Sequence, residues 1–473
     1  MRHRRSIRFV VSILFVRATR VFMKLLRLKG THFPGQLAKK LCPDFLHRIE
    51  KPDKIIAVTG TNGKTTVANM VADLARTFGL TFAHNAYGSN IEEGIITTLL
   101  DATTLTGKKK LPLAILEIDE RLTRIIFKAI RPDYLIITNL FRESYLRNAH
   151  GEFIYDLLDE SITSDTHVIV NADDLLSQNL AADRPHTAFG IARLPGEKLI
   201  TESLIRDVVL CPRCHGQLTD QFIRYHHIGR SRCDACGWHS LNADYEITSI
   251  LSVDSEKALP FDKLQDADSL VLNTKDGEEL YPFRGENILD LYNELAAITL
   301  FRTLGKSRDE IAQALTGIII GQSRKEIVEV GDKRVYRMLA KGKNPIAVSR
   351  VLGAVHPIPG KKQFILLIDT STETVTIEDN AAWIFDADLA LLNADDVTRV
   401  VVAGRRCEDF RVALLLAGVD KEKIVTRRDK HDAADALLFE EGSETIAILY
   451  SLYNEPVSRI VAKCLYEHLE ARC

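Results

Sequence analysis

The feature that most constrains this chain is a short apolar run that ends in a glycine-rich turn and continues into a helical pattern. The run Ile55–Val58 leads into Thr59-Gly60-Thr61-Asn62-Gly63-Lys64-Thr65-Thr66, and apolar residues then recur at helical spacing as far as Phe78. Strand, turn and helix in this order present backbone N–H groups and the positive end of a helix to phosphate. The pattern predicts an α/β domain that uses a nucleoside triphosphate.

The turn differs from the standard phosphate-binding loop, which requires glycine where this chain has Val58. Lys64 can reach the outer phosphates, and the hydroxyl of Thr65 can hold Mg²⁺. The alternative is a glycine-rich turn without a ligand, but the order of the elements favours phosphate. The residues expected to bind the nucleoside triphosphate are Gly60, Thr61, Asn62, Gly63, Lys64, Thr65 and Thr66.

Glu117 ends the second apolar run, Leu113–Glu117, and two more carboxylates, Asp119 and Glu120, come directly after Ile118. A carboxylate beside the phosphate loop can hold Mg²⁺ and neutralise charge on a transferring phosphoryl group. We expect Glu117 to do so, with Asp119 and Glu120 orienting the metal or the substrate. The alternative is a solvated acidic turn.

Further apolar runs alternate with helical patterns, which predicts a mainly parallel sheet covered by helices, with ligands gathered at the carboxyl ends of its strands. The next strands are expected at Tyr134–Thr138 and His167–Asn171. Asn171 to Asp174 is a polar turn for which loop capping is at least as good an explanation as substrate contact. Asn287 opens a helical pattern that also holds Asn293, and capping is its simplest role.

Two C-x-x-C pairs, Cys211/Cys214 and Cys233/Cys236, are separated by 18 residues. This is the spacing of a Cys₄ zinc ribbon, in which Zn²⁺ is structural because four thiolates close its coordination shell. The alternative, a redox dithiol, would come as a single pair. Four histidines in this stretch are interpreted as surface groups or neighbours of the metal site: His215, His226, His227 and His239.

The 473 residues are too many for one typical domain. We expect a basic amphipathic segment at 1–50, an ATP-binding α/β domain at 51–327 with the ribbon inserted at 208–240, and a second α/β domain at 328–473. The strands expected in the last domain are Phe364–Asp369, Leu389–Leu392, Arg399–Ala403 and Thr445–Leu449.

The charge pattern limits the partners of this chain. The net charge of -2 argues against a nucleic-acid-binding surface. Eight scattered or paired cysteines fit a reducing compartment, so a cytoplasmic location is expected. The N-terminal helix has two interpretations: it docks on the first domain, or its basic face rests on anionic lipid at the inner face of the plasma membrane.

Together these motifs resemble one branch of the Mur ligase family, the MurT-type subunit of lipid II isoglutaminyl synthase, over nearly the whole chain. The ribbon inside a Mur-type ATPase domain is the most specific element. The stretches that carry the resemblance are TGTNGKTT, HNAYGSN, LEIDE, TNLFRE, NADD, CPRC with CDACGW, ENILDLYNELAA, KGKNP, DNAAWIFDAD and VVVAGRRCEDF.

The resemblance implies a Mur-ligase central ATPase domain with a zinc ribbon, followed by a Rossmann-like C-terminal domain. It implies amidation of the D-glutamate α-carboxylate in the lipid II stem peptide to D-isoglutamine, through an acyl phosphate. ATP and Mg²⁺ serve this reaction, and a glutaminase partner supplies the ammonia. In the family, Lys64 and Glu117 serve catalysis, and Asn287 and Asn293 lie near the adenine.

The family's C-terminal domain also donates an aspartate to the Cys-His triad of its partner, a role that Asp379 matches best and Asp386 second. The sequence departs from the family around both aspartates. It also departs at Leu146, which stands where the family usually has a carboxylate. Glu143, three residues earlier, can supply the missing carboxylate. Two other functions stay open. One is an amino-acid-adding ligase of the Mur or folylpolyglutamate synthase kind, and the other is a nucleotide-dependent scaffold.

Overall fold

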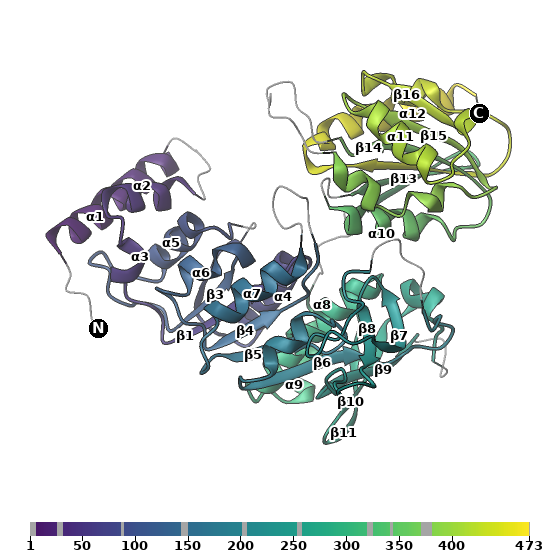
Figure 1. Ribbon diagram of the computed structural model, residues 1–473. Helices are drawn as coiled ribbons and strands as arrows, with labels where there is room; N and C mark the ends of the chain where they lie inside the picture. Colours follow the sequence, from purple (N-terminus) through teal and green to yellow (C-terminus); the bar gives the residue numbers. More distant parts are fainter. Residues whose placement is uncertain are drawn as a thin grey trace. The chain divides into compact units, whose positions relative to one another are not determined.

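The computed structural model describes residues 6–25, 32–86, 89–142, 150–200, 206–252, 258–318, 325–340, 344–369 and 381–472. Apart from Arg142, these residues form two compact units, the first from the chain before residue 322 and the second from the chain after it (Figure 1). Each unit is built around its own β-sheet.

The first unit contains a nine-stranded sheet in the order β11-β10-β9-β6-β5-β4-β1-β3-β2. Neighbours from β2 to β9 run parallel, and β10 and β11 continue antiparallel. The strands are β1 Lys54–Thr59, β2 Phe82–His84, β3 Leu113–Glu117, β4 Tyr134–Ile137, β5 His167–Asn171, β6 His186–Ile191, β9 Tyr245–Leu251, β10 Ser269–Thr274 and β11 Gly277–Pro282.

Helices cover both faces of this sheet, which is why the central strands are continuous apolar runs rather than alternating ones. Along β1, Ile55 and Ala57 face one helical layer, and α4 (Lys64–Thr77) and α8 (Ile288–Thr303) pack on the other side. The remaining helices of the unit are α1 Ile7–Leu25, α2 Phe33–Leu41, α3 Phe45–Arg48, α5 Glu92–Asp101, α6 Thr123–Ile126, α7 Gly151–Ser161 and α9 Arg308–Thr316.

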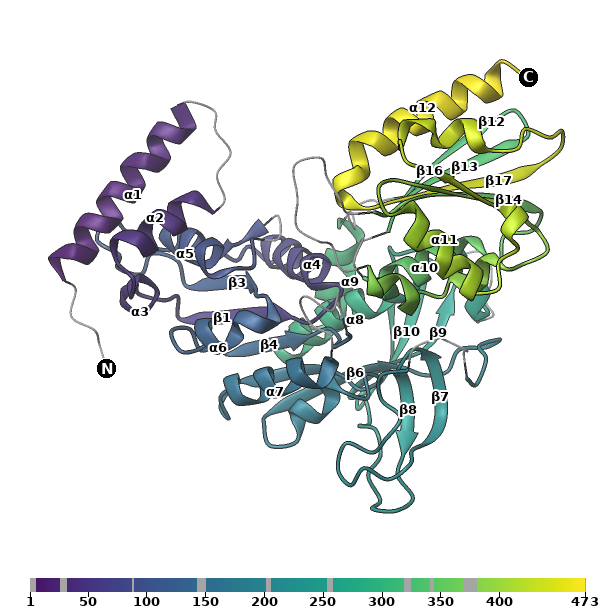
Figure 2. The ribbon, with the colours of Figure 1, turned by 45° about the horizontal axis from the view of Figure 1, so that its top comes forward.

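Helix α1 lies along the outer edge of the first unit beside α2 (Figure 2). Phe9, Ile13 and Val16, spaced four and three residues apart, are fully buried in the core of the unit. Of the two interpretations of this helix, docking on the first domain is therefore confirmed. Among the described residues, no helix is long and apolar enough to cross a membrane.

The basic face expected on α1 is not the outward one. Arg8 donates to the carbonyl of Leu41 at the end of α2, and Arg17 donates to the carbonyls of Leu100 and Thr103 at the end of α5. These arginines turn toward the protein because helix C-termini carry carbonyls that lack helical partners and attract cations.

The second unit holds a six-stranded sheet in the order β12-β13-β17-β14-β15-β16, in which only the β12–β13 pair is antiparallel. Its strands are β12 Lys325–Val330, β13 Lys333–Leu339, β14 Lys361–Leu367, β15 Val397–Ala403, β16 Ile424–Arg427 and β17 Glu444–Tyr450. Its helices are α10 Pro345–Val355, α11 Cys407–Leu416 and α12 Glu455–Glu470.

One strand expected in this unit is wrong. Leu389–Leu392 is a short 3₁₀ helix, and Leu389 and Leu392, three residues apart, are the two leucines that point inward. A half-buried strand buries every second residue, whereas a helical turn buries the first and the fourth. A four-residue apolar run cannot distinguish the two.

Candidate active site

The predicted phosphate loop connects β1 to α4, with Lys64, Thr65 and Thr66 in the first turn of the helix. Gly60 and Gly63 have φ angles of +125° and +87°, which favour glycine. A Cβ on Gly60 would lie 2.8 Å from the carbonyl oxygen of Asn139, and one on Gly63 would lie 2.3 Å from Oδ1 of Asn293. Both glycines are therefore required by close neighbours as well as by φ.

The end of β4 holds this loop in place. The N–H of Thr61 donates to the carbonyl of Asn139 (2.8 Å), and the N–H of Asn62 donates to the side-chain oxygen of the same asparagine (2.9 Å). The hydroxyl of Thr138 donates to the carbonyl of Asn62 (2.7 Å), and the N–H of Phe141 donates to the hydroxyl of Thr61 (2.9 Å). The loop is thus preorganised by neighbouring strands.

Lys64 makes the main ionic contact of the site. Its ammonium donates to the carbonyls of Gly60 and Thr61 and lies 3.0 Å from a carboxylate oxygen of Glu120. The Glu120 side chain is 3% exposed, so the pair is almost fully shielded from water. Sequence reasoning did not pair these two residues, because no local pattern brings Glu120 back to the loop.

Glu117 ends β3 as expected and is buried. Its carboxylate accepts a hydrogen bond from the side-chain amide of Asn90 (3.1 Å), and Asn85 bonds both its backbone N–H and its carbonyl. Burial opposes ionisation of Asp119 nearby, but hydrogen bonds and charge from Arg121 outweigh it and lower the pKa of Asp119. The structure therefore gathers buried carboxylates beside the loop.

Helix α8 brings Asn293 to the loop, where its carboxamide lies against Gly63. Asn287 caps the start of the same helix: its side-chain oxygen accepts from the N–H groups of Leu289 and Asp290. This is the simplest role that its position suggested, and an additional contact with adenine stays a prediction.

The four ribbon cysteines converge as predicted. Sulfur atoms of Cys211 and Cys236 lie 3.6 Å apart, those of Cys214 and Cys233 lie 3.5 Å apart, and all four are within 4.8 Å of one another. Four sulfurs bound tetrahedrally at the usual zinc–sulfur distance would be about 3.8 Å apart. The side chains therefore fit a single Zn²⁺ ion.

Each C-x-x-C pair forms a tight turn, here called a knuckle, and the two knuckles fold in the same way. The residue after its second cysteine has a positive φ, His215 at 59° and Gly237 at 74°. The N–H groups of these residues donate to the carbonyls of Cys211 and Cys233 respectively. Between the knuckles, β7 Thr219–Tyr225 and β8 Ile228–Arg232 form an antiparallel hairpin.

His226 and His227 are both buried, so the surface interpretation of the ribbon histidines is wrong for these two. His227 is hydrogen-bonded to Asp174 (3.1 Å) and lies 3.6 Å from Asp207. Burial lowers the pKa of His227, but these two carboxylates overcome it and raise the pKa to about 9. The hairpin turn thus inserts a charged imidazole into the first unit.

His227 connects the ribbon to the phosphate loop. Asp174 also accepts from the N–H of Leu140 (2.8 Å), and the ring of Phe141 lies 4.7 Å from the imidazole. Phe141 in turn bonds Thr61 of the loop. The Asn171–Asp174 turn therefore makes structural contacts, in agreement with the loop-capping interpretation.

A second buried network joins the ribbon to α8. Arg224 of β7 is fully buried and pairs with Glu197 at 2.5 Å, while its guanidinium lies 3.6 Å from Asp173. The hydroxyl of Tyr292 donates to Asp173 (2.8 Å) and accepts from Arg224. Because Tyr292 adjoins Asn293, the ribbon also contacts the helix that borders the loop.

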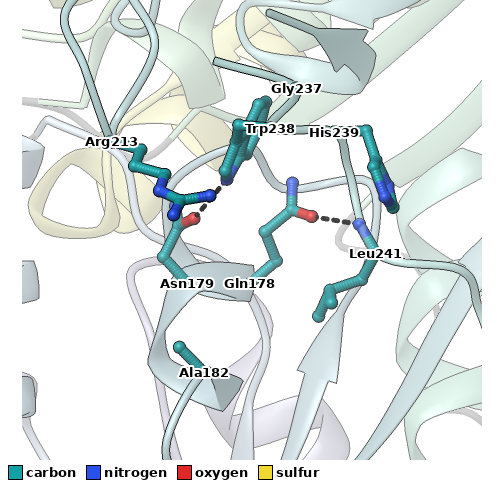
Figure 3. Close-up of a pocket in the computed structure, with 8 residues that line it drawn as sticks. All are labelled: Gln178, Asn179, Ala182, Arg213, Gly237, Trp238, His239 and Leu241. Carbon is teal, nitrogen blue, oxygen red and sulfur yellow. Dashed lines mark hydrogen bonds between the residues drawn. The ribbon is translucent and has the colours of Figure 1, made fainter.

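The ribbon further docks on the short helix after β5, next to a hollow of about 260 Å³ (Figure 3). There the indole N–H of Trp238 donates to Asn179 and the N–H of Leu241 donates to Gln178. None of the residues predicted to bind nucleotide or metal lines this hollow.

The predicted triad aspartate, Asp379, lies outside the described residues, as do Glu143 and Leu146. Asp386 is half-buried at the end of a 3₁₀ turn. Asp369, after β14, is buried and accepts from the N–H of Arg406.

Comparison with known families matches two parts of this chain. The Mur ligase middle domain matches residues 58–195, and the MurT ligase C-terminal domain matches residues 342–453. Both matches fall where the phosphate loop and the second unit lie.

Two curated relatives carry the same name, lipid II isoglutaminyl synthase (glutamine-hydrolyzing) subunit MurT. The protein from Staphylococcus aureus (strain COL) is 28% identical over 408 residues, 84% of this chain and 86% of its own length. The protein from Streptococcus pneumoniae (strain R6) is 28% identical over 400 residues, 84% of each chain.

Solved structures share the fold at lower identity. The pseudomurein peptide ligase type C from Methanothermus fervidus has a TM-score of 0.63 at 18% identity, covering 91% of this chain and 84% of its own. MurF ligase from Thermotoga maritima, solved in complex with ADP, has a TM-score of 0.56 at 16% identity, covering 93% and 85%.

The fold, the clamped phosphate loop and these matches define a Mur-type ligase. Within that class the C-terminal match and the curated relatives are more specific. Together they support a MurT-type Mur ligase.

Proposed function

We propose that this protein amidates the α-carboxylate of D-glutamate in the lipid II stem peptide, using ATP and ammonia released by a glutaminase partner. The observation that carries the proposal is the presence, in one chain, of a Mur middle domain and a MurT C-terminal domain. That chain aligns along most of its length with relatives named as subunits of this synthase.

The phosphate loop is proposed to hold ATP. The first bond of the α4 ladder runs from the N–H of Val67 to the carbonyl of Gly63, so the amides of residues 64–66 precede it and point toward the loop. Lys64 is already positioned by Glu120, and an incoming phosphate would compete with that carboxylate for the ammonium.

Glu117 and Thr65 are proposed to hold Mg²⁺, which when bound offsets negative charge on the transferring phosphoryl group. Glu117 fits this role because Asn85 and Asn90 fix its backbone and its carboxylate, which limits the motion of a ligand oxygen. The four ribbon thiolates are proposed to hold one structural Zn²⁺ that secures the hairpin carrying Arg224 and His227.

The test is incorporation of isotope-labelled ammonia into lipid II with ATP. Lys64→Ala is expected to abolish incorporation while the circular dichroism spectrum stays native. Lys108→Ala, an exposed lysine of the same unit, is the control and should retain activity. Normal amidation by Lys64→Ala would contradict the proposal, and incorporation of an amino acid instead of ammonia would favour the amino-acid-adding alternative.

The glutaminase partner is tested by comparing two nitrogen sources. We propose that Asp379, or Asp386 in its place, completes the partner's Cys-His triad by orienting the histidine. Asp379→Ala should lower glutamine-dependent amidation and leave amidation with free ammonia unchanged, and Asp386→Ala serves as the comparison. Equal loss with both nitrogen sources would argue against this role.

A further inference from the structure

The outward face of α1 is a continuous apolar stripe. Seven of its large apolar side chains are 49% to 85% exposed, and Ala18 lies among them on the same face. At 100° per residue these positions fall within one sector of the helix, opposite the buried row that begins with Phe9. The stripe residues are Ile7, Val11, Leu14, Phe15, Ala18, Val21, Phe22 and Leu25.

The stripe is long and firmly oriented. Helix α1 has 19 residues, so it runs for roughly 28 Å along the surface of the first unit. Arg17 binds the carbonyls at the end of α5, Arg20 pairs with Asp101 through two bonds of 2.7 and 3.1 Å, and Phe9 packs on Phe45. These contacts prevent the helix from rotating to bury its apolar side.

In sequence, the stripe lies within a stretch whose charges have one sign. Residues 1–43 contain eleven lysines and arginines and no aspartate or glutamate, whereas the rest of the chain has 51 basic against 64 acidic residues. In sequence, basic residues precede the helix at positions 2, 4 and 5, and others stand at positions 24, 27 and 29, around the end of the stripe. An apolar helix face with basic residues at both ends matches the surface of an anionic bilayer.

We propose that α1 lies flat in the interface of an anionic lipid bilayer, with its stripe inserted among the lipid chains and the first unit held at the membrane surface. This deepens the proposed function, on which it rests for its purpose: lipid II is anchored by a lipid tail, and a helix packed on the ATPase domain would keep the phosphate loop near that substrate. The bilayer surface is the occupant to which the charge pattern points.

Vesicle binding by the full-length protein tests the proposal. Wild type should float with vesicles of equal parts phosphatidylglycerol and phosphatidylcholine, and bind more weakly to phosphatidylcholine alone. Phe15→Ser combined with Phe22→Ser should weaken binding at least tenfold, since each change removes a large exposed apolar group. The matched control, Leu416→Ser with Leu452→Ser, removes two exposed apolar residues of the second unit and should bind as wild type does.

Three results would overturn the proposal. Equal binding by wild type and the stripe variant would show that α1 does not insert. Dissociation of a wild-type dimer by the stripe variant would assign the stripe to a second copy of this chain. Loss of the glutaminase subunit from the stripe variant would assign it to that partner.

A separate assay distinguishes failure of this inference from failure of the proposed function. Amidation of detergent-dispersed lipid II should be unchanged in the stripe variant, because its substitutions lie on the outer face of α1 and the detergent replaces the bilayer. Absence of amidation in wild type would refute the proposed function and leave vesicle binding as an independent result.

Discussion

Replacing Gly63 with alanine separates two causes that make glycine necessary in the phosphate loop. The first is backbone strain, because φ at this position is +87° and an L-residue there costs roughly 1–2 kcal/mol. The second is a clash, because the new Cβ would lie 2.3 Å from Oδ1 of Asn293. Displacing that buried amide is expected to cost about 1–3 kcal/mol more, as for other overpacked sites.

Gly79, just beyond the other end of α4, supplies the matched control. Its φ is +69°, but nothing lies within 4 Å of the Cβ that alanine would add. Gly79→Ala should therefore cost only the strain of roughly 1–2 kcal/mol. The difference between the two variants in the free energy of unfolding, measured in urea, isolates the clash.

A double-mutant cycle with Asn293→Ala completes the test. Removing the amide should restore at least about 1 kcal/mol of stability to Gly63→Ala, a coupling well above the error of additivity. ATP affinity, measured by calorimetry, should fall in Gly63→Ala and recover in part in the double variant if Asn293 displaces the loop. The reasoning is refuted if Gly63→Ala costs no more than Gly79→Ala, or if the two substitutions are additive.

Three further predictions follow from other parts of the first unit. Because the pKa of His227 is raised from 6.5 to about 9, its stabilisation of up to about 3 kcal/mol is fully present below pH 6.5 and lost as pH rises through 9. Urea unfolding of wild type and His227→Gln should therefore converge over that range, and a constant difference would contradict it. Metal analysis should find one zinc per wild-type chain and none in Cys214→Ser; two equivalents in wild type would refute a single ribbon site. Arg17→Ala should destabilise the docking of α1 by about 1–2 kcal/mol, seen as faster amide hydrogen exchange in α1, whereas Arg124→Ala, on an exposed face, should not.

The elements of the site could be predicted where short-range patterns determine them. The strands β3 and β5 have the predicted bounds. Strand β1, predicted at Ile55–Thr59, and β4 each differ by one residue at one end. Such runs are long, apolar and followed by turn residues, so period and length alone identify them. The ribbon was equally accessible, because its knuckles place the thiolates of each pair through local backbone turns.

Other features depend on side chains that meet across long stretches of sequence. Lys64 and Glu120 are 56 residues apart, and Asp173 and Tyr292 are 119 residues apart. The burial of His227 likewise depends on Asp174, 53 residues earlier in the chain. No periodicity encodes these pairs, because they form only when parallel strands and the inserted hairpin come together.

Helix α1 illustrates the division between what local sequence determines and what tertiary contacts decide. Its sequence determined that it would be a basic, amphipathic helix, since apolar residues recur at helical spacing among arginines. Only the tertiary structure decided which face is buried, because Arg8, Arg17 and Arg20 are drawn inward by the carbonyls and the carboxylate at the ends of α2 and α5. Similarly, the sequence by itself determined a phosphate loop, whereas the clamp from β4 and the position of Asn293 follow from the packing of elements distant in the chain.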